Sequence, residues 1–381
     1  MSKHSLWELE SFYAPKSVII IGSGLGGLWS AYYLKKLRPG WEIALVDKGL
    51  VPSGASTRNA GFASFGSLTE LVYDARMLGI EKMLGLVHMR FRGLRKIRKM
   101  FPDHLIDFRR YGGFELISAG QYGSLQQLQH DIEWINGCLR QVTRTKHVFR
   151  ISDKKISVFG FENTAHLVEN KLEAQLHSGK LVQQLLQKVL SLGVSLLPGM
   201  EVKGFEQSGD GFLVHTEPGA PLFARKLLVC TNAMAGQLLP GLDLQPARGQ
   251  ILVTSPVQNL PFRGTFHADE GFYYFRNLGK RVLLGGARNK AFEAEQTFDP
   301  SLSDTIQQEL ERYLREVILP GRSFSVEHRW SGIMGMGSSK FPTVKQVSPG
   351  CFCATGMGGM GVAFSPVVGK RVAQMMVEAS A

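Results

Sequence analysis

The chain contains only four cysteines in 381 residues, and their spacing matches neither a zinc site nor a dithiol redox motif. Cys138 and Cys230 stand alone, whereas Cys351 and Cys353 are separated by a single residue, with no histidine cluster beside them. Unpaired cysteines are among the most frequently buried residues of globular proteins. We therefore expect reduced, buried thiols with a structural role, and the sequence predicts no metal site.

Long apolar runs are also missing. No stretch of about eighteen apolar residues occurs, which argues against a membrane-spanning helix. The first residues, MSKHSLWELESFYAPK, lack the apolar core of a secretory signal, so we expect a cytoplasmic protein. The sequence has no internal repeat or low-complexity tract. With 44% hydrophobic and 20% charged residues, it is typical of one large α/β unit or of two interleaved domains.

Acidic residues are fewer than basic ones, because 32 Asp and Glu stand against 44 Lys and Arg and give a net charge of +12. Part of the excess lies at residues 89–110, where apolar side chains fit one helical face and basic side chains surround the other. The simplest interpretation is a solvated helix face. Attraction to anionic lipid or to RNA is the alternative that the sequence leaves open.

The first fifty residues have the pattern of a βαβ unit. Residues 17–21 (SVIII) form a short, β-branched, nearly all-apolar run, as expected for a strand buried on both faces of a parallel sheet. A glycine-rich turn and an apolar helix follow, and Pro39-Gly40 ends this helix. A second strand then leads to Asp47. Further along, the sequence predicts helices at 125–140, 181–192, 304–317 and 366–376, and strands at 112–118, 226–230 and 351–355.

The turn after the first strand reads Gly22-x-Gly24-x-x-Gly27. Gly22 permits a tight turn, Gly24 lets the backbone approach a pyrophosphate, and Gly27 lets the helix pack closely on the strand. The helix N-terminus then offers unpaired N–H groups to phosphate oxygens. Asp47 follows Gly27 by twenty residues at the end of the second strand, where a carboxylate can bind ribose hydroxyls. Together these features predict a dinucleotide site.

Two further segments favour FAD over NAD. Residues 52–62 (PSGASTRNAGF) follow the second strand, and their small and hydroxyl-bearing side chains suit a chain lying along a diphosphate and the edge of a flavin. Residues 356–362 (GMGGMGV) lie between a short strand and the last helix. This second helix N-terminus would face the flavin locus that gathers negative charge on reduction.

At these residues the sequence resembles the D-amino acid oxidase family of FAD-dependent oxidoreductases, which includes glycine oxidase, sarcosine oxidase and γ-glutamylputrescine oxidase. Five segments match in order along almost the whole chain: GSGLGG, residues 54–61, LLVCTNA, residues 246–250 (PARGQ), and Trp330-Ser331-Gly332 with GMGGMGV. The resemblance implies an α/β fold with a Rossmann-like FAD-binding domain and a second domain built on an antiparallel sheet. The expected FAD domain is discontinuous, at 1–85, 160–245 and 320–381, and the expected substrate domain comprises 86–159 and 246–319.

The resemblance also implies site residues. The predicted cofactor-binding residues are Gly22, Ser23, Gly24, Leu25, Gly26, Gly27, Asp47, Lys48, Ala55, Ser56, Arg58, Asn59, Ala60, Gly61, Phe62, Val202, Thr231, Asn232, Gly332, Met334, Gly356, Gly358, Gly359, Met360, Gly361 and Val362. The predicted catalytic-site residues are Tyr273, Tyr274 and Arg276, on the strand expected to cover the flavin. Because neighbouring side chains of a strand point to opposite faces, Tyr273 and Tyr274 cannot both face the substrate.

Three departures from the family pattern bear on the substrate and the acceptor. Met334 stands where amino-acid oxidases of the family often carry an arginine for the substrate carboxylate, so Arg276 or Arg288 takes that role or the substrate lacks a carboxylate there. Neither a cysteine at 334–340 nor a histidine in the early loop is present to attach the flavin, which implies non-covalent FAD. Leu283 lies near the position of a lysine that assists the reaction with oxygen, so O2 or another acceptor stays open.

The implied reaction is oxidation of the C–N bond of a small amine or amino acid to an imine, by hydride transfer to flavin N5, and the imine then hydrolyses. His267, the nearest candidate base, is expected to be a packed or rim residue. Two alternatives stay open: oxidation of a carboxymethylamino group on a tRNA wobble uridine, which the positive charge would suit, and a flavin-binding module without turnover. The sequence leaves the oligomeric state open as well.

Overall fold

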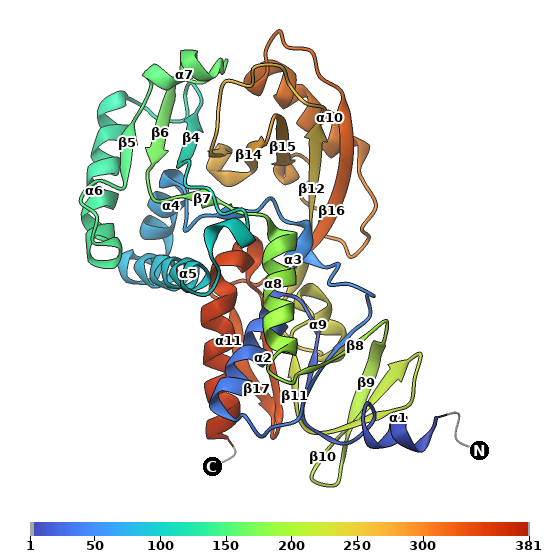
Figure 1. The fold of residues 1–381 in the computed structure, drawn as a ribbon. Helices are drawn as coiled ribbons and strands as arrows, with labels where there is room; N and C mark the ends of the chain where they lie inside the picture. Colours follow the sequence, from blue (N-terminus) through green and yellow to red (C-terminus); the bar gives the residue numbers. More distant parts are fainter. Residues whose placement is uncertain (1–3, 380–381) are drawn as a thin grey trace. The chain divides into compact units, whose positions relative to one another are not determined.

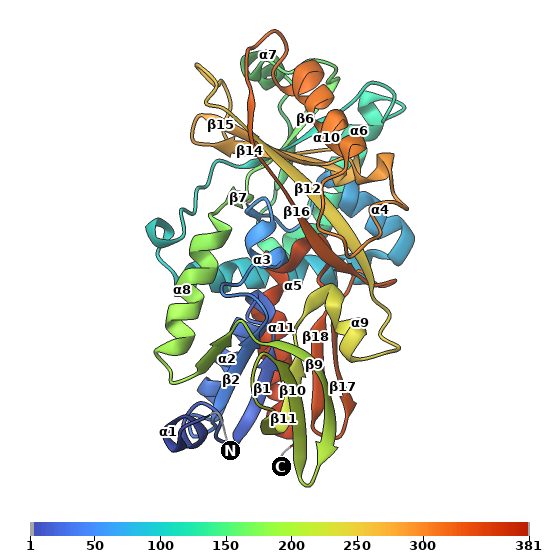
Figure 2. The same ribbon diagram turned by 90° about the vertical axis from the view of Figure 1, so that its right-hand side faces the viewer.

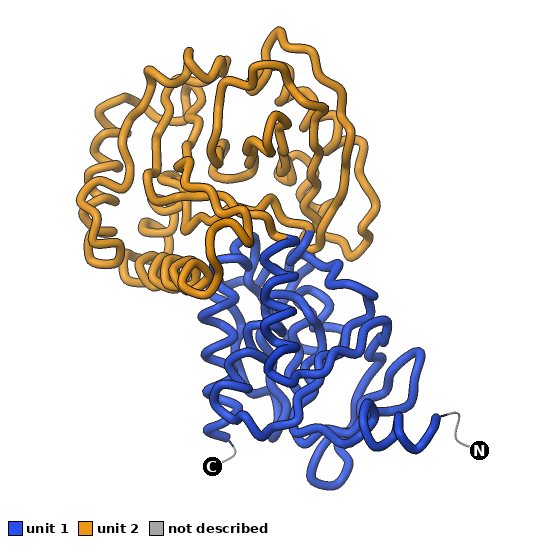
Figure 3. Tube along the Cα trace, viewed as in Figure 1, with its two compact units in different colours: residues 1–57, 179–246, 334–381 blue, residues 58–178, 247–333 orange. Residues whose placement is uncertain are grey.

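The computed structural model describes residues 4–379, which form two units, each built on its own β-sheet (Figure 1, Figure 3). The first unit comprises residues 1–57, 179–246 and 334–381, and the second comprises 58–178 and 247–333. The chain therefore passes between the units four times. These crossings differ from the boundaries expected at 85/86, 159/160, 245/246 and 319/320, chiefly because residues 58–85 and 160–178 pair and pack within the second unit.

The first unit contains a parallel sheet with the strand order β18-β11-β1-β2-β8 (Figure 2). An antiparallel strand, β17, extends it beyond β18, and the β9–β10 hairpin pairs with β11. The strands are β1 (Lys16–Ile21), β2 (Ile43–Asp47), β8 (Ser195–Pro198), β9 (Glu201–Ser208), β10 (Gly211–Glu217), β11 (Leu222–Val229), β17 (Thr343–Ser348) and β18 (Cys351–Thr355). The predicted strands at 17–21, 226–230 and 351–355 are confirmed, and their C-terminal ends agree within one residue, although β11 begins four residues earlier than predicted.

Helices α2 and α11 lie side by side on this sheet (Figure 1). The other face packs against α9 and the β9–β10 hairpin in one apolar cluster. The helices of this unit are α1 (Leu6–Glu10), α2 (Leu25–Leu37), α8 (Ser178–Leu190), α9 (Ala235–Leu238) and α11 (Gly361–Glu378), and α3 (Ala55–Arg58) ends at the boundary. The last helix begins at Gly361, five residues before the predicted Pro366, which lies inside the helix. Proline has no N–H to donate to the Val362 carbonyl one turn earlier, and the Ser365 hydroxyl donates to that carbonyl at 3.5 Å instead.

The second unit contains a sheet with the order β16-β12-β15-β14-β13-β4-β6-β5. In this sheet β13 and β4 are parallel, whereas β12–β15, β15–β14, β14–β13, β4–β6 and β6–β5 are antiparallel pairs. Its strands are β4 (Gly113–Ile117), β5 (Phe149–Ile151), β6 (His166–Asn170), β12 (Gln245–Thr254), β13 (Thr265–Ala268), β14 (Tyr273–Leu278), β15 (Arg281–Gly286) and β16 (Val326–Met336). A small ribbon pairs β3 (Phe62–Ala63) with β7 (Ala174–Gln175).

The two faces of this sheet are covered differently. One face packs against α10 and the turn after it in a phenylalanine-rich cluster. On the other face, α4, α5 and α6 cover the end formed by β4, β5 and β6, and a second apolar cluster lies on β12, β14 and β15. The helices are α4 (Leu68–Leu78), α5 (Ile80–Met100), α6 (Leu125–Thr143), α7 (Lys154–Phe159) and α10 (Asp304–Tyr313), followed by a π-helical turn, Leu314–Ile318.

The predicted α/β class, with a Rossmann-like unit and a second unit on a largely antiparallel sheet, is confirmed. Three of the four cysteines are buried and Cys138 is half-buried, and none of them forms a disulfide. The described part of the chain, residues 4–379, has no helix that combines the length and the apolar character needed to cross a membrane.

Candidate active site

The glycine turn between β1 and α2 is shaped by close backbone contacts. Gly22 has a φ of 103°, in the region that favours glycine, and a Cβ on it would lie 2.9 Å from the Cys230 carbonyl oxygen. A Cβ on Gly27 would lie only 2.0 Å from the Gly22 carbonyl oxygen. Helix α2 begins after Gly24 without a side-chain cap from that residue, and the Leu25 N–H donates to the Ser56 hydroxyl at 2.9 Å. The turn therefore presents a helix N-terminus lined by backbone and one hydroxyl.

Asp47 lies at the end of β2, directly beside this turn. Its Oδ2 accepts hydrogen bonds from the Ser23 amide and the Ser23 hydroxyl, both at 2.7 Å, and its Oδ1 accepts from the Gly49 amide at 2.9 Å. A carboxylate has about four acceptor positions, so roughly one is left for a ribose hydroxyl. The exposed Lys48 follows Asp47, and Met200, two residues before Val202 on β9, donates its amide to the Asp47 carbonyl at 2.9 Å.

Two threonine hydroxyls mark the carboxyl edge of the same sheet. Thr231 follows β11 and Thr355 ends β18, and in the described residues neither buried Oγ1 has a hydrogen-bond partner. Buried polar atoms are nearly always satisfied, and ligands of open α/β sheets bind at the carboxyl ends of the strands. These hydroxyls therefore fit the polar groups of a bound dinucleotide. Thr231 and its neighbour Asn232 were predicted, whereas Thr355 was missed although it directly precedes the predicted Gly356.

The C-terminal glycine segment adopts two left-handed positions, Gly356 with a φ of 67° and Gly358 with a φ of 53°. A 3-10 turn, Gly358–Met360, leads into α11, whose first residues are the predicted Gly361 and Val362. The Met334 sulfur lies 3.9 Å from the position of a Cβ on Gly359. The first unit thus brings Met334 together with the second helix N-terminus.

The predicted residues from Arg58 to Phe62 belong to the second unit, whereas Ala55 and Ser56 belong to the first. Arg58 donates its Nη1 to the Ser331 carbonyl at 2.8 Å, and the Trp330 indole donates to the Arg58 carbonyl at 2.9 Å. A Cβ on Gly332 would lie 3.0 Å from the Arg58 Cβ, so these two predicted residues are neighbours. The side-chain oxygen of Asn59 accepts from the Gly61 amide at 2.9 Å and from the Ser178 hydroxyl at 2.5 Å.

Tyr273 and Tyr274 point to opposite faces of β14. The Tyr273 hydroxyl donates to Glu309 of α10 at 2.5 Å, and its ring stacks on Tyr313 with a centroid distance of 4.3 Å. This is the face of the phenylalanine-rich cluster. Of the two predicted tyrosines, only Tyr274 shares a face with Arg276, so we retain Tyr274 alone as a candidate.

Tyr274 lies in the second apolar cluster, whose members are Ala60, Ile251, Val253 and Leu283 with Phe62, Tyr274 and Trp330 packed against them. Its ring is edge-on to Phe62 at 6.1 Å. Burial raises the pKa of Tyr274 to about 12, although the charge of Arg288 lowers it. The hydroxyl is therefore a neutral hydrogen-bond donor at ordinary pH.

Arg276 is buried and binds backbone carbonyls. Its Nη1 donates to Leu176 at 2.8 Å and to Gly61 at 3.1 Å, and its buried Nε has no partner in the described residues. Burial lowers the pKa of this guanidinium to about 10, while the charge of Asp107 raises it. Arg276 therefore joins the ribbon that carries Gly61 and Phe62 to the large sheet.

Sequence reasoning missed a buried carboxylate beside the same ribbon, whose partners on β13 are paired with Tyr274 and Arg276. Glu173, directly before β7, lies with its Oε2 3.1 Å from His267 Nε2, accepts from the Thr265 hydroxyl at 2.9 Å, and also binds the Ser64 hydroxyl. Burial alone lowers the pKa of His267, but nearby carboxylates, above all Glu173, raise it above its ordinary value. A single glutamate outside any motif cannot be recognised as a site residue from the sequence alone. His267 is packed edge-on against Phe62 at 5.2 Å.

A protein family and a relative of known sequence match nearly the whole chain. A family model described as FAD dependent oxidoreductase (DAO) matches residues 17–375, a range that contains every predicted site residue. A protein named probable oxidoreductase OrdL, from Rhizobium meliloti (strain 1021), is 26% identical over 371 residues, which cover 94% of this chain and 82% of that protein.

Two solved structures share the fold over nearly their whole length. L-proline dehydrogenase from P. horikoshii matches with a TM-score of 0.74 and 16% identity, covering 96% of this chain and 94% of that one. Glycine oxidase from Geobacillus kaustophilus matches with a TM-score of 0.71 and 21% identity, covering 96% and 95%. The predicted two-part, D-amino acid oxidase-like fold is thereby confirmed.

Proposed function

The chain belongs to the DAO family of FAD dependent oxidoreductases, and from this premise we propose that it oxidises the C–N bond of a small amino acid or carboxymethylamine, with FAD held non-covalently. FAD is its cofactor. When bound, FAD supplies the chemistry of the step, because it accepts a hydride from the carbon next to the amine. The substrate leaves as an imine, which water hydrolyses to a carbonyl compound and a free amine.

The cofactor would be held by residues around the N-termini of two helices, α2 and α11. Backbone N–H groups at the start of α2 suit the pyrophosphate, Asp47 suits a ribose, and the hydroxyls of Thr231 and Thr355 would gain the partners they lack. The start of α11 at Gly361 offers a second positive helix end.

One observation supports the location of the substrate. Within the second unit, the segment expected to line the flavin contacts the face expected to hold the substrate: Gly61 binds Arg276, and Phe62 packs against Tyr274. Both contacts lie inside one unit. We propose that the substrate lies on this face, between the ribbon and the apolar cluster.

The residues of this face suit an amino acid. Arg288, whose charge acts on the Tyr274 hydroxyl, would bind the carboxylate, since the Nη1 of Arg276 already binds two carbonyls. The apolar side chains of Ile251, Val253 and Leu283 would disfavour an ammonium ion and so keep the amine neutral for oxidation.

Anaerobic titration of the purified flavoprotein tests the proposal. Glycine, sarcosine, iminodiacetate, L-proline and putrescine would each be added while the flavin absorbance is followed. Bleaching by at least one carboxylate-bearing amine is expected. Bleaching by putrescine alone contradicts the substrate class, and flavin that stays with acid-precipitated protein contradicts non-covalent binding.

A matched pair of variants tests whether the substrate lies on the face of β14 that carries Tyr274. Tyr274→Phe removes a hydroxyl from the proposed substrate face, whereas Tyr273→Phe removes one from the opposite face. We expect Tyr274→Phe to lower kcat/KM by about tenfold, as for one lost hydrogen bond, and Tyr273→Phe to leave it unchanged while lowering Tm. Equal kinetic effects of the two changes would contradict the assignment.

A second candidate, a tRNA-borne carboxymethylamino group, is favoured by the outer face of α5. Arg92, Arg95 and Lys99 are exposed on this face, and none of them forms an ion pair with a described carboxylate. Like charges on one helical face repel each other, so an anionic partner would stabilise them. Salt-dependent binding of unmodified tRNA that is lost in Arg92→Glu/Arg95→Glu supports this candidate, and its absence at low salt excludes it.

A further inference from the structure

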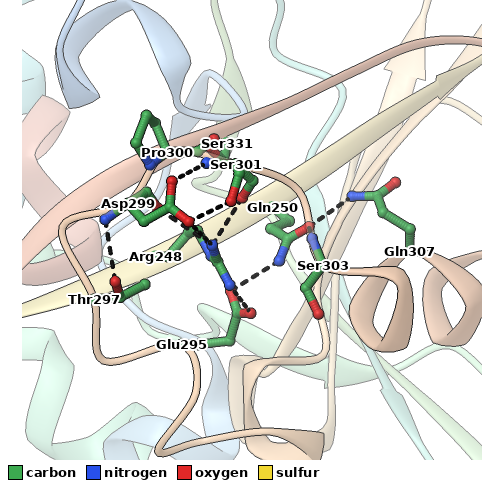
Figure 4. Close-up of polar contacts among 10 residues, drawn as sticks. All are labelled: Arg248, Gln250, Glu295, Thr297, Asp299, Pro300, Ser301, Ser303, Gln307 and Ser331. Carbon is green, nitrogen blue, oxygen red and sulfur yellow. Dashed lines mark hydrogen bonds and ion pairs between the residues drawn. The ribbon is translucent and has the colours of Figure 1, made fainter.

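The PARGQ segment at the start of β12 forms the centre of a buried polar network (Figure 4). The Arg248 guanidinium binds Glu295 through two bonds, Nε to Oε2 at 2.9 Å and Nη2 to Oε1 at 2.7 Å. Gln250, on the same face of the strand, donates its amide to Glu295 Oε2 at 2.9 Å. The backbone N–H of Arg248 also donates to the Glu295 carbonyl at 2.7 Å. Glu295 is fully buried.

The remaining polar groups of the network are also satisfied. Arg248 Nη1 donates to the carbonyls of Ser301 at 2.8 Å and Asp299 at 3.2 Å. The Gln250 oxygen accepts from the Ser303 amide at 3.0 Å and from the Gln307 side chain at 3.1 Å. A fully satisfied network of this kind holds a unique arrangement of the segments it joins. Here it joins β12 to the loop before α10.

A second guanidinium lies on the same loop. Arg288 begins the 3-10 turn Arg288–Lys290 and packs on the Phe292 ring at 4.3 Å. Two consecutive turns lead from it to Glu295, because the Ala291 amide donates to the Arg288 carbonyl at 3.1 Å and the Glu295 amide donates to the Ala291 carbonyl at 3.0 Å. Burial lowers the pKa of Arg288, and the charge of Glu295 opposes that effect.

The loop thus contains one buried carboxylate, Glu295, and two guanidinium groups lie near it, whereas Glu293 and Asp299 of the loop are exposed. Three side-chain donors of Arg248 and Gln250 already occupy Glu295. We propose that Arg248 is a positioning residue: by neutralising Glu295, it prevents an internal ion pair with Arg288 and leaves Arg288 free for the substrate carboxylate. This inference rests on the proposed function.

Removal of Arg248 would leave a buried carboxylate without a counter-ion, which is strongly unfavourable. Arg288 is the partly buried cation of the same loop that could take its place, whereas Lys290 is exposed. In the resulting Arg288–Glu295 pair, the guanidinium would no longer be available to bind the substrate carboxylate. If Glu295 is neutralised at the same time, no buried carboxylate of the loop competes, and Arg288 should again be free.

Steady-state kinetics of Arg248→Met, Glu295→Gln and the double variant test this reasoning, with the carboxylate-bearing amine that reduces the wild type as the probe. Arg248→Met should raise KM by at least about tenfold, the scale of one charge-assisted bond, with kcat changed far less. The double variant should recover most of the lost affinity. The control Arg281→Met, which removes a partly exposed pair with Glu327 on the same sheet, should leave KM unchanged.

A merely structural role gives a different pattern, since both single changes would weaken the loop and the double variant would be no better than Arg248→Met. That outcome overturns the proposal. A crystal structure of FAD-loaded Arg248→Met provides a readout without turnover: an Arg288–Glu295 pair within 4 Å is expected, and an unmoved Arg288 overturns the inference. If no carboxylate-bearing amine reduces the wild type, the proposed function has failed, and this structure still decides the role of Arg248.

Discussion

Gly27→Ala should damage the FAD site more than its single added methyl group suggests. The new Cβ would lie 2.0 Å from the Gly22 carbonyl oxygen, and an ordinary contact needs at least 3.4 Å, so these groups must separate by about 1.4 Å. Gly22 cannot simply withdraw, because its N–H donates to the Val46 carbonyl at 2.8 Å and its backbone lies directly beside Cys230 at the end of β11. The start of α2 therefore has to move.

The size of the effect follows from this displacement. A phosphate hydrogen bond of about 2.9 Å that lengthens by more than 1 Å is lost, and each charge-assisted bond is worth about 1.5–3 kcal/mol. We therefore expect FAD affinity to fall by about 10- to 150-fold. Overpacking should lower the stability of the apoprotein by about 1–3 kcal/mol, less the roughly 1 kcal/mol that alanine gains over glycine inside a helix.

Isothermal titration of the apoprotein with FAD measures the affinity, and calorimetric melting with and without FAD measures the stability. Gly40→Ala is the matched control, because Gly40 lies just beyond the other end of α2 and a Cβ there meets no atom within 4 Å. FAD affinity of Gly27→Ala within about threefold of the wild type would refute the reasoning.

Four further predictions concern charged residues. Asp47→Asn should weaken FAD binding by about 1.5–3 kcal/mol in the same titration, since a neutral amide replaces a charged acceptor. Arg288→Ala should raise KM for the carboxylate-bearing substrate by about 100-fold with a smaller change in kcat, and an unchanged KM contradicts its role. Arg276→Ala should instead lower Tm and FAD affinity, because it releases the Gly61 segment, and should leave the KM of the FAD-saturated enzyme nearly unchanged. Burial raises the pKa of Glu115 above 4.5, so the contribution of this group to the stability of the wild type is lost as the pH rises from 4.5 through the folded pKa, and the Tm of Glu115→Gln relative to the wild type should rise over that window.

The cofactor-binding residues of the first unit could be predicted because the motifs that mark them are short and continuous in the sequence. The β1 strand, the glycine turn and Asp47 lie within about thirty residues, and each residue type has a backbone or charge reason that a single sequence reveals. For α11 the sequence predicts an N-terminus five residues too late, because proline is typical of the first helical position, whereas Pro366 lies inside this helix.

The substrate half was less predictable because its contacts join distant segments. Strand alternation correctly separates Tyr273 from Tyr274, but only the sheet order shows which of them shares a face with Phe62. The link from Arg248 to Glu295 spans 47 positions, and the bond from Arg276 to Gly61 spans 215. Nothing in local sequence indicates such partners. The position of Arg276 on β14 gives no hint either that its side chain binds backbone carbonyls.

The position of β18 within the parallel sheet has a consequence for biosynthesis. This strand pairs with β11 on one side and β17 on the other, yet residues 351–355 leave the ribosome long after β1, β2, β8 and β11. Until then the nascent chain exposes the backbone edge of β11, a site open to wrong pairing, and lacks both Thr355 and the second helix N-terminus. FAD should therefore load only after residues 351–362 have left the ribosome, and chaperones should protect that edge until then.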